Sequence, residues 1–270
     1  MLNLMTIRDE IYHHNSSEFG ELINYKSPYT LVKAVYYMET ASIFLFLTQA
    51  FIRSPNFITM LYVIAGVVGA FLLITEQNTL FNVGLFLVFT KGTFDWADGP
   101  LARRLNKTSF IGHSLDTYGA QVNDSAFRLS FIYYTLVYYP NLMFLFPVIA
   151  FIILITKFSV FSDILYYKAK NNITLDNVRK IRDTEVEESL KDPKNIKGIA
   201  NLYYHYQSIL DARARSIDFL LLILLVDKIF DYDLSKLLLS LSMLIVLRSL
   251  VKYVADFYYA FNVYKEGTNG

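Results

Sequence analysis

The amino-acid sequence predicts an all-α integral membrane protein with a core of six transmembrane helices. Of its 270 residues, 54% are hydrophobic and 16% are aromatic, and the mean hydropathy is +0.34. Soluble domains of similar size are less apolar than this. The hydrophobic residues also gather in runs long enough to cross a lipid bilayer. Composition and run length together predict the membrane class.

Six apolar segments have the length that a spanning helix needs. About twenty mostly apolar residues are required, because roughly 30 Å of hydrocarbon must be crossed at about 1.5 Å per residue. We therefore expect spanning helices over residues 57–75, 79–97, 111–138, 142–165, 216–232 and 235–262.

The connections between these segments alternate in charge. Those at Glu76, Pro140 and Asp231 are short and poor in Lys and Arg, whereas the others are rich in both. Lys and Arg are enriched in cytoplasmic loops, so the basic connections are expected in the cytoplasm. The longest of them, at about 166–213, is expected to form a cytoplasmic helical insertion. The sequence thus predicts a multi-pass protein.

Residues 1–53 form an N-terminal segment ahead of the six-helix domain of residues 54–270. Its stretch 30–52 is apolar enough to span a membrane, yet it contains Lys33 and Glu39. Two placements are open: an interfacial helix on the cytoplasmic surface, or an additional transmembrane helix. We favour the interfacial placement.

The charge balance and the absence of cysteine exclude several classes of function. The formal net charge is only +1 and the chain has no cysteine. Nucleic acid is not expected as a partner, because the basic residues are neither in surplus nor gathered on one long face. A disulfide framework and a thiolate metal site are impossible without cysteine.

Three acidic residues are expected to meet at the cytoplasmic end of two neighbouring helices. Asp95 and Asp98 end the segment 79–97, and Asp116 lies early in the segment 111–138. Ionised side chains at membrane depth are costly and usually serve a function. Oxygen ligands without nearby His or Cys select Mg²⁺ or Mn²⁺. The alternative is an acid pair at a helix end, neutralised by Lys and Arg neighbours.

The residues around the acids favour a pocket for a polyanion that opens to the cytoplasm. Gly99 and Ala102 leave a face of small residues, and Arg103 offers a planar fork of donors for phosphate. Gly112, four residues before Asp116, permits close approach of helices.

The full pattern resembles the signature of the CDP-alcohol phosphotransferase (CDP-alcohol phosphatidyltransferase) family. Seven of its eight fixed positions match, in the string Asp95-x2-Asp98-Gly99-x2-Ala102-Arg103-x8-Gly112-x3-Asp116-x3-Ala120. The family also commonly begins its first core helix with Pro-Asn and a Thr three residues on, which is similar to the run from Pro55 to Thr59.

The resemblance implies a homodimeric six-helix membrane enzyme of phospholipid or related polar-lipid synthesis. Such enzymes transfer a phosphoalcohol group from a CDP-linked donor to an acceptor hydroxyl and release CMP. By resemblance, the acids would hold one or two Mg²⁺ or Mn²⁺ ions, and the nucleotide would lie along the remaining motif residues. The metal ligands would be Asp95, Asp98 and Asp116, and the nucleotide site would be formed by Gly99, Ala102, Arg103, Gly112 and Asp116. The donor and the acceptor both stay open.

The one departure from the family pattern is Ala120, at the position of the expected catalytic base. Alanine can neither accept the acceptor proton nor touch a metal, and losing a general base typically costs about 10² to 10⁴ in rate. The chain is thus an engineered variant that holds substrates without turnover, a natural enzyme with another base, or a natural binder without catalysis. The nearest acid, Asp124, lies one turn further along and is expected to pair with Arg128.

Two further functions are weighed against the transferase. One is the non-catalytic binding of CDP-linked ligands, and the other is ion-coupled transport with the three acids as a cation relay. A transporter should carry acids nearer the bilayer midplane and inverted halves, and the sequence shows neither. Three residues are expected to line the acceptor site or the cavity: Asp124, Arg128 and Arg248.

Overall fold

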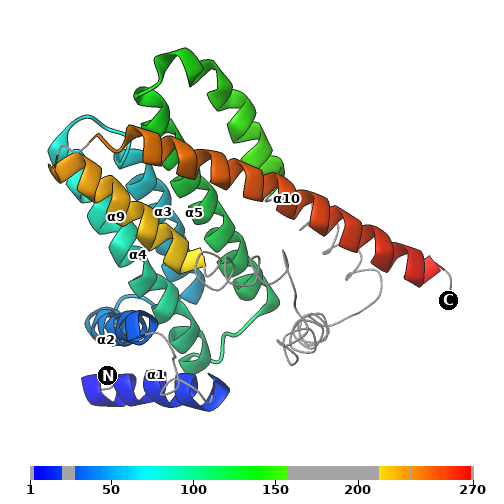
Figure 1. Ribbon diagram of the computed structural model, residues 1–270. Helices are drawn as coiled ribbons and strands as arrows, with labels where there is room; N and C mark the ends of the chain where they lie inside the picture. Colours follow the sequence, from blue (N-terminus) through cyan, green and yellow to red (C-terminus); the bar gives the residue numbers. More distant parts are fainter. Residues whose placement is uncertain (1–2, 20–27, 157–212, 231–232, 269–270) are drawn as a thin grey trace. The chain divides into compact units, whose positions relative to one another are not determined.

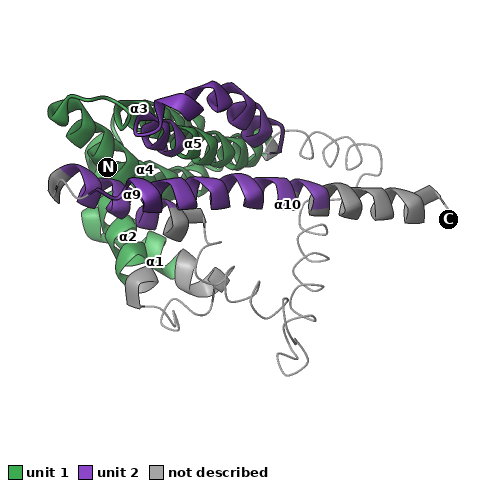
Figure 2. Ribbon diagram, turned by 45° about the horizontal axis from the view of Figure 1, so that its top comes forward, with its two compact units in different colours: residues 1–130 green, residues 131–270 purple. Residues whose placement is uncertain are grey.

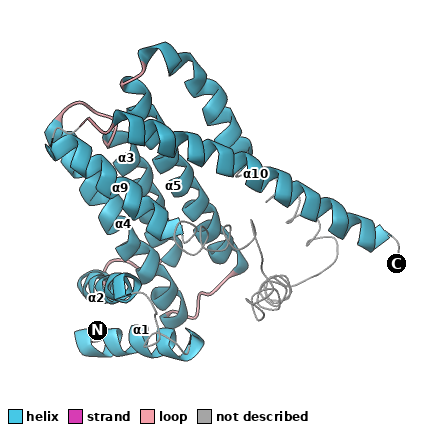
Figure 3. Ribbon diagram, in the orientation of Figure 1, coloured by secondary structure: helices cyan, strands magenta, loops and turns pink. Residues whose placement is uncertain are grey.

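The computed structural model describes residues 3–19, 28–156, 213–230 and 233–268. Every regular element within these ranges is a helix, which confirms the predicted helical class for the described part of the chain (Figures 1 and 3). In chain order, the elements are α1 Leu4–Phe19, α2 Pro28–Thr48, α3 Pro55–Leu72, α4 Asn78–Arg104, α5 Phe110–Val137, the 3-10 helix η2 Pro140–Leu145, α9 Arg213–Phe230 and α10 Ser235–Thr268.

Each of the six expected spanning segments coincides with a described helix. The helix that begins with η2 runs on to Thr156, so the segment expected at 142–165 is described only in its first part. The expected insertion at about 166–213 falls outside the described residues, apart from its last position.

The described helices differ in whether their length and hydropathy suffice to cross a membrane. In the ranges that the structure describes, α3 is the helix long and apolar enough to cross a membrane by itself, and Pro140–Thr156 is apolar but shorter. α4 and α5 carry the acids and other polar residues of the motif, which lowers their hydropathy. The other expected spans therefore stay predictions.

The end of α4 differs from the prediction. The spanning segment was expected to end at residue 97, but α4 continues to Arg104 with Pro100 inside it. Proline removes one helical hydrogen bond, so tertiary packing must hold this last stretch. Ala97 and Leu101 are buried here, and they provide that packing. The motif residues from Asp95 to Arg103 therefore lie on one continuous helix.

The chain divides into two compact units, residues 1–130 and 131–270, with the border inside α5 (Figure 2). The first unit contains α1 to α4 and most of α5, and with them the whole motif. In the second unit, the buried carboxylate of Asp227 accepts hydrogen bonds from Tyr134 and Tyr138, both at 2.7 Å. These contacts join the end of α5 to α9.

Small residues set the close contact of α3 with α4 and α5 in the first unit. A Cβ on Gly84 of α4 would lie 2.8 Å from the carbonyl oxygen of Gly69 in α3, and a Cβ on Gly119 of α5 would lie 2.6 Å from Val63. Neither position has room for a side chain. Glycine is therefore what lets the three helices approach closely enough to bring their motif residues together.

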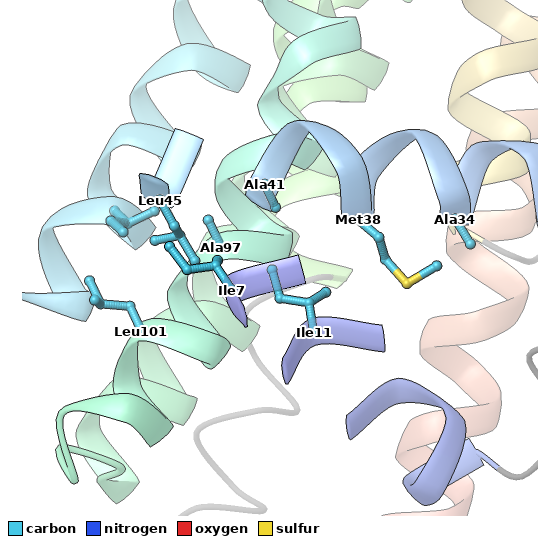
Figure 4. Close-up of a cluster of buried hydrophobic side chains, with 9 residues drawn as sticks. Ile7, Ile11, Ala34, Met38, Ala41, Leu45, Ala97 and Leu101 are labelled. Carbon is cyan, nitrogen blue, oxygen red and sulfur yellow. The ribbon is translucent and has the colours of Figure 1, made fainter. Parts of the chain in front are cut away.

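α1 and α2 pack beside the lower end of α4 in Figure 1, and neither runs along it. A cluster of buried apolar side chains joins the three helices (Figure 4). The guanidinium of Arg8 in α1 also forms an ion pair with Glu39 of α2, with 2.7 Å between Nη2 and Oε1, and Tyr12 donates a hydrogen bond to the same carboxylate. The N-terminal helices are thus fixed to the end of the unit that holds the motif.

Candidate functional site

The three motif acids gather between α4 and α5. Asp95 interacts electrostatically with both Asp98 and Asp116, and it lies within hydrogen-bonding reach of Asp116. Asp98 and Asp116 also interact with each other. The structure therefore brings together the three carboxylates that the sequence spacing predicted as neighbours. Like charges at such short range repel one another unless a cation or a shared proton compensates them.

Two basic side chains lie close to the acids. Lys91, one turn before Asp95 on α4, interacts with Asp95, and its Nζ also lies 5.9 Å from the centre of the Tyr62 ring. Arg103 interacts with Asp98. Three carboxylates thus face two cations. The neutralised acid pair weighed from the sequence accounts for part of the cluster, and Asp95 and Asp116 also lie within hydrogen-bonding reach of each other.

Thr59 of α3 fixes the orientation of Asp98. Its hydroxyl donates a hydrogen bond of 2.6 Å to Oδ2 of Asp98, and both residues are buried. Since α3 and α4 are held close by their glycines, this bond is short and shielded from water. The sequence singled out Thr59 only through the family resemblance. Its partner could not be read from the chain, because 39 residues separate the two.

The two motif glycines leave space for neighbouring polar groups. A Cβ on Gly99 would lie 3.3 Å from Nη1 of Arg103, so the guanidinium lies over the glycine. A Cβ on Gly112 would lie 3.3 Å from Oδ1 of Asn56, which places the start of α3 beside the start of α5. Together these contacts place the polar side chains of Arg103 and Asn56 over the two motif glycines. Ala102, on the same stretch of α4, is half-buried.

The donor set fits a divalent cation, although no preformed cage is present. Among the residues that the structure describes, no group of three His, Cys, Asp or Glu side chains is arranged closely enough to hold a metal. The three carboxylates interact but would have to turn toward a common point. Their all-oxygen donors suit Mg²⁺ or Mn²⁺. The chemistry of the residues therefore agrees with the predicted metal.

Ala120 lies on α5 one turn after Asp116. The next acid along the helix, Asp124, is paired with an arginine. Asp124 forms a buried ion pair with Arg128, with 2.8 Å between Oδ1 and Nε. The side chains are 2% and 5% exposed, respectively. This confirms the pairing predicted from the four-residue spacing. The next carboxylate along α5 is therefore engaged by a guanidinium.

Asn123 was not predicted and lies at the contact of α5 with α3. It is fully buried, and its Nδ2 donates to the carbonyl oxygen of Tyr62 at 3.2 Å. A Cβ on Gly66 would lie 2.1 Å from Oδ1 of Asn123, so the amide fills the space above that glycine. Only the register of two distant helices creates this contact, and the local sequence carries no signal for it.

Arg248 lies on α10 in the second unit. Its predicted place in the cavity stays a prediction, because the acids lie in the first unit.

Comparison with protein families gives one match. Residues 52–183 match the model of the CDP-alcohol phosphatidyltransferase family, a range that begins just before α3 and includes the whole motif. Comparisons with curated proteins and with solved structures returned no match. Members of the matched family are membrane-embedded transferases.

The hydrogen bond from Thr59 to Asp98 yields a prediction about stability. Thr59→Val keeps the shape but leaves a buried carboxylate without its donor, and hydrogen bonds to charged groups contribute about 1.5–3 kcal/mol. The thermal midpoint in detergent should fall by roughly 3–10 °C. Thr59→Ser should lose much less. Thr90→Val is the matched control, since Thr90 bonds only its own helix. Equal midpoints for Thr59→Val and Thr90→Val would show that the bond does not hold the unit together.

Proposed function

We propose that this chain, which belongs to the CDP-alcohol phosphatidyltransferase family through residues 52–183, binds a CDP-linked donor and transfers its phosphoalcohol group to an acceptor hydroxyl. The products are CMP and a phosphodiester of the kind found in phospholipids and related polar lipids. Family membership supports the reaction class. The identity of the donor and the acceptor hydroxyl is left open, since every acceptor would leave the same signature unchanged.

The single observation that carries the proposal is the meeting of Asp95, Asp98 and Asp116 beside Arg103 on two closely packed helices. A diphosphate needs both a positive charge and a planar donor, and this arrangement can supply both. The carboxylates attract divalent cations, and Arg103 is suited to bidentate contact with phosphate oxygens. Its guanidinium lies over Gly99, where no side chain separates it from the helix.

The proposed reaction breaks one phosphate bond and forms another. The acceptor oxygen attacks the phosphorus that bears the alcohol, the bond to the bridging oxygen breaks, and CMP leaves with that oxygen. A divalent ion held by the three acids would neutralise the charge that develops on the leaving phosphate. Thr59 keeps Asp98 oriented, and Arg103 would hold the donor in line. The proton of the acceptor hydroxyl must go to a base.

Among the described residues, the site lacks an evident general base. Ala120 has no group to accept the proton, and Asp124 is bound to Arg128. We therefore propose that the chain binds its donor well and turns it over slowly. The second candidate function, a binder of CDP-linked ligands without catalysis, is favoured by this same alanine. Donor binding is common to both candidates, and the rate of CMP release separates them.

The membrane placement follows from the family and from the surface of α3. The family is membrane-embedded, and α3 carries a row of exposed apolar side chains at helical spacing, namely Phe57, Met60, Ile64, Val68 and Phe71. Such a face suits contact with lipid or with a second copy of the predicted homodimer. We propose that the polar end with the motif faces the cytoplasm and that α1 and α2 lie at that membrane surface.

Cysteine labelling tests this orientation, and the chain has no cysteine of its own. Asn106 follows α4 at the motif end, and Asn141 lies in η2, after α5. A cysteine at Asn106 should react with a membrane-impermeant maleimide only from the cytoplasmic side of sealed vesicles, and one at Asn141 only from the opposite side. Labelling of both from the same side would refute the orientation.

Donor binding should depend on a divalent cation. Three carboxylates remain to neutralise the diphosphate through a bound ion, so calorimetry should show CDP-diacylglycerol or CDP-choline binding with Mg²⁺ or Mn²⁺ and a loss of about tenfold or more with chelator. Asp98→Asn should abolish the effect of the metal. Asp218→Asn removes a carboxylate from α9 in the other unit and serves as the matched control. Donor affinity that is identical with and without the cation would contradict the proposed site.

Restoring the acid should restore the chemistry. Ala120→Asp should raise CMP release by about 10² or more, the typical contribution of a general base, when CDP-linked donors are screened against a panel of hydroxyl acceptors. The new side chain would project from α5 one turn after Asp116, so no change of backbone is needed.

Two further variants make this test specific. Asp116→Asn in the Ala120→Asp background should abolish the gain, because a proposed metal ligand is lost. Asp124→Asn should have a milder effect, as expected for the partner of Arg128. If the unaltered chain turned over CDP-alcohols briskly and Asp124→Asn alone stopped it, Asp124 would be the base and the proposed role of position 120 would be wrong.

A further inference from the structure

The helix α4 presents different residues of the motif to different neighbours. Asp95 and Asp98 face the acid cluster, whereas Ala97 and Leu101 are buried in the apolar cluster with α1 and α2. Figure 4 shows Ile7 of α1 beside Ala97 and Ile11 of the same helix pointing toward α2. The back of the motif is therefore a docking face for the N-terminal helix.

α1 docks through two of its own faces. Ile7 and Ile11, four residues apart and therefore on one side of the helix, are both completely buried. One step around the helix, Glu10 forms an ion pair with Arg104, with 2.8 Å between Oε2 and Nη2. α1 therefore meets the end of α4 through two kinds of contact, an apolar one and an ion pair.

Arg103, the neighbour of Arg104, lies where the two environments meet. It interacts with Asp98 and covers Gly99 on the side of the acids. It also lines an open pocket of about 590 Å³ together with side chains of α1. The other lining residues are Thr6, Asp9, Glu10, His13, Pro100 and Arg104. Arg103, which is expected to bind the donor diphosphate, thus contacts the acid cluster and also lines the pocket together with α1.

We propose that α1 is a positioning element of the donor site: Ile7, Ile11 and Glu10 hold the last turn of α4 so that Arg103 is aimed at the diphosphate of a CDP-linked donor. The inference rests on the proposed function. It assigns a role to a helix that lies outside residues 52–183, the range that matches the family. Pro100 gives this support a purpose, because it removes the helical hydrogen bond to the carbonyl of Trp96, in the turn just before the one that carries Arg103.

The sole tryptophan of the chain gives a direct readout of this docking. Trp96 lies between Asp95 and Ala97 on α4 and packs, partly buried, against the cluster that holds α1. Ile11→Ala removes a completely buried side chain at the contact, so Trp96 should become more exposed and its emission should shift to the red. In the same variant the Kd for CDP-diacylglycerol with Mn²⁺ should rise at least fivefold. Ile43→Ala, the same change at an exposed site on α2, should alter neither.

Charge variants test positioning without disturbing the apolar core. The Glu10–Arg104 pair is partly exposed, at 44% and 16% of the side chains, so Glu10→Gln should raise the donor Kd only about two- to fivefold at low salt. The exchanged pair, Glu10→Arg with Arg104→Glu, should bring it back toward the original value. Glu76→Gln, at the turn between α3 and α4, is the matched control for loss of an exposed carboxylate.

The outcomes separate this inference from the function on which it rests. If the original chain binds the donor, and Ile11→Ala and Glu10→Gln bind it equally well, the positioning role is wrong and the proposed function stands. The role is also wrong if Ile11→Ala leaves the emission of Trp96 unchanged. A chain that binds no CDP-linked donor with any divalent cation would overturn both.

Discussion

The central constraint on the first unit is the electrostatic repulsion among three carboxylates that lie close together. Asp95, Asp98 and Asp116 interact with one another between two packed helices. Ionised groups in such a place must be compensated by cations, hydrogen bonds or a bound metal. Lys91, Arg103 and the hydroxyl of Thr59 provide part of this compensation. Under the proposed function, a divalent cation held by the three carboxylates would complete this compensation.

Close packing of the helices is what allows the three carboxylates to lie near one another. The acids can meet only if α3, α4 and α5 approach closely, and glycines make that approach possible at three contacts. Asn123 adds a buried amide that fills the space over Gly66 and bonds the backbone of α3. The glycines of these helices thus set the distance between the helix backbones. They fix the spacing on which the relative position of Asp98 and Asp116 depends.

The residue at position 120 affects the repulsion among these carboxylates. An aspartate there would place a fourth carboxylate one turn from Asp116, and its repulsion would have to be met as well. Under the proposed function, Ala120 avoids that repulsion but has no group that could take the acceptor proton. The buried pair of Asp124 and Arg128 is electrically neutral, so it relieves nothing and offers no ready base. Under the proposed function, an aspartate at position 120 would favour turnover at a cost in stability.

Local spacing made part of this account predictable. The apolar runs gave the helices, the motif gave the neighbouring acids, and the four-residue interval gave the Asp124–Arg128 pair. Contacts between distant segments were beyond local patterns. The extension of α4 past residue 97, the bond from Thr59 to Asp98 and the docking of α1 each depend on residues far apart in the chain. Pro100 removes a hydrogen bond within α4, yet the helix continues past it, and Ala97 and Leu101 are buried along this stretch.

The central claim is that Asp95, Asp98 and Asp116 form one cation site that receives the donor diphosphate. It is tested most directly by an experimental structure of the full chain with Mn²⁺ and a CDP-linked donor, recorded at a wavelength where manganese scatters anomalously. We predict an anomalous peak at coordination distance from the three carboxylates and beside the diphosphate. A donor bound with no manganese between these carboxylates, or with the metal elsewhere, would contradict the account.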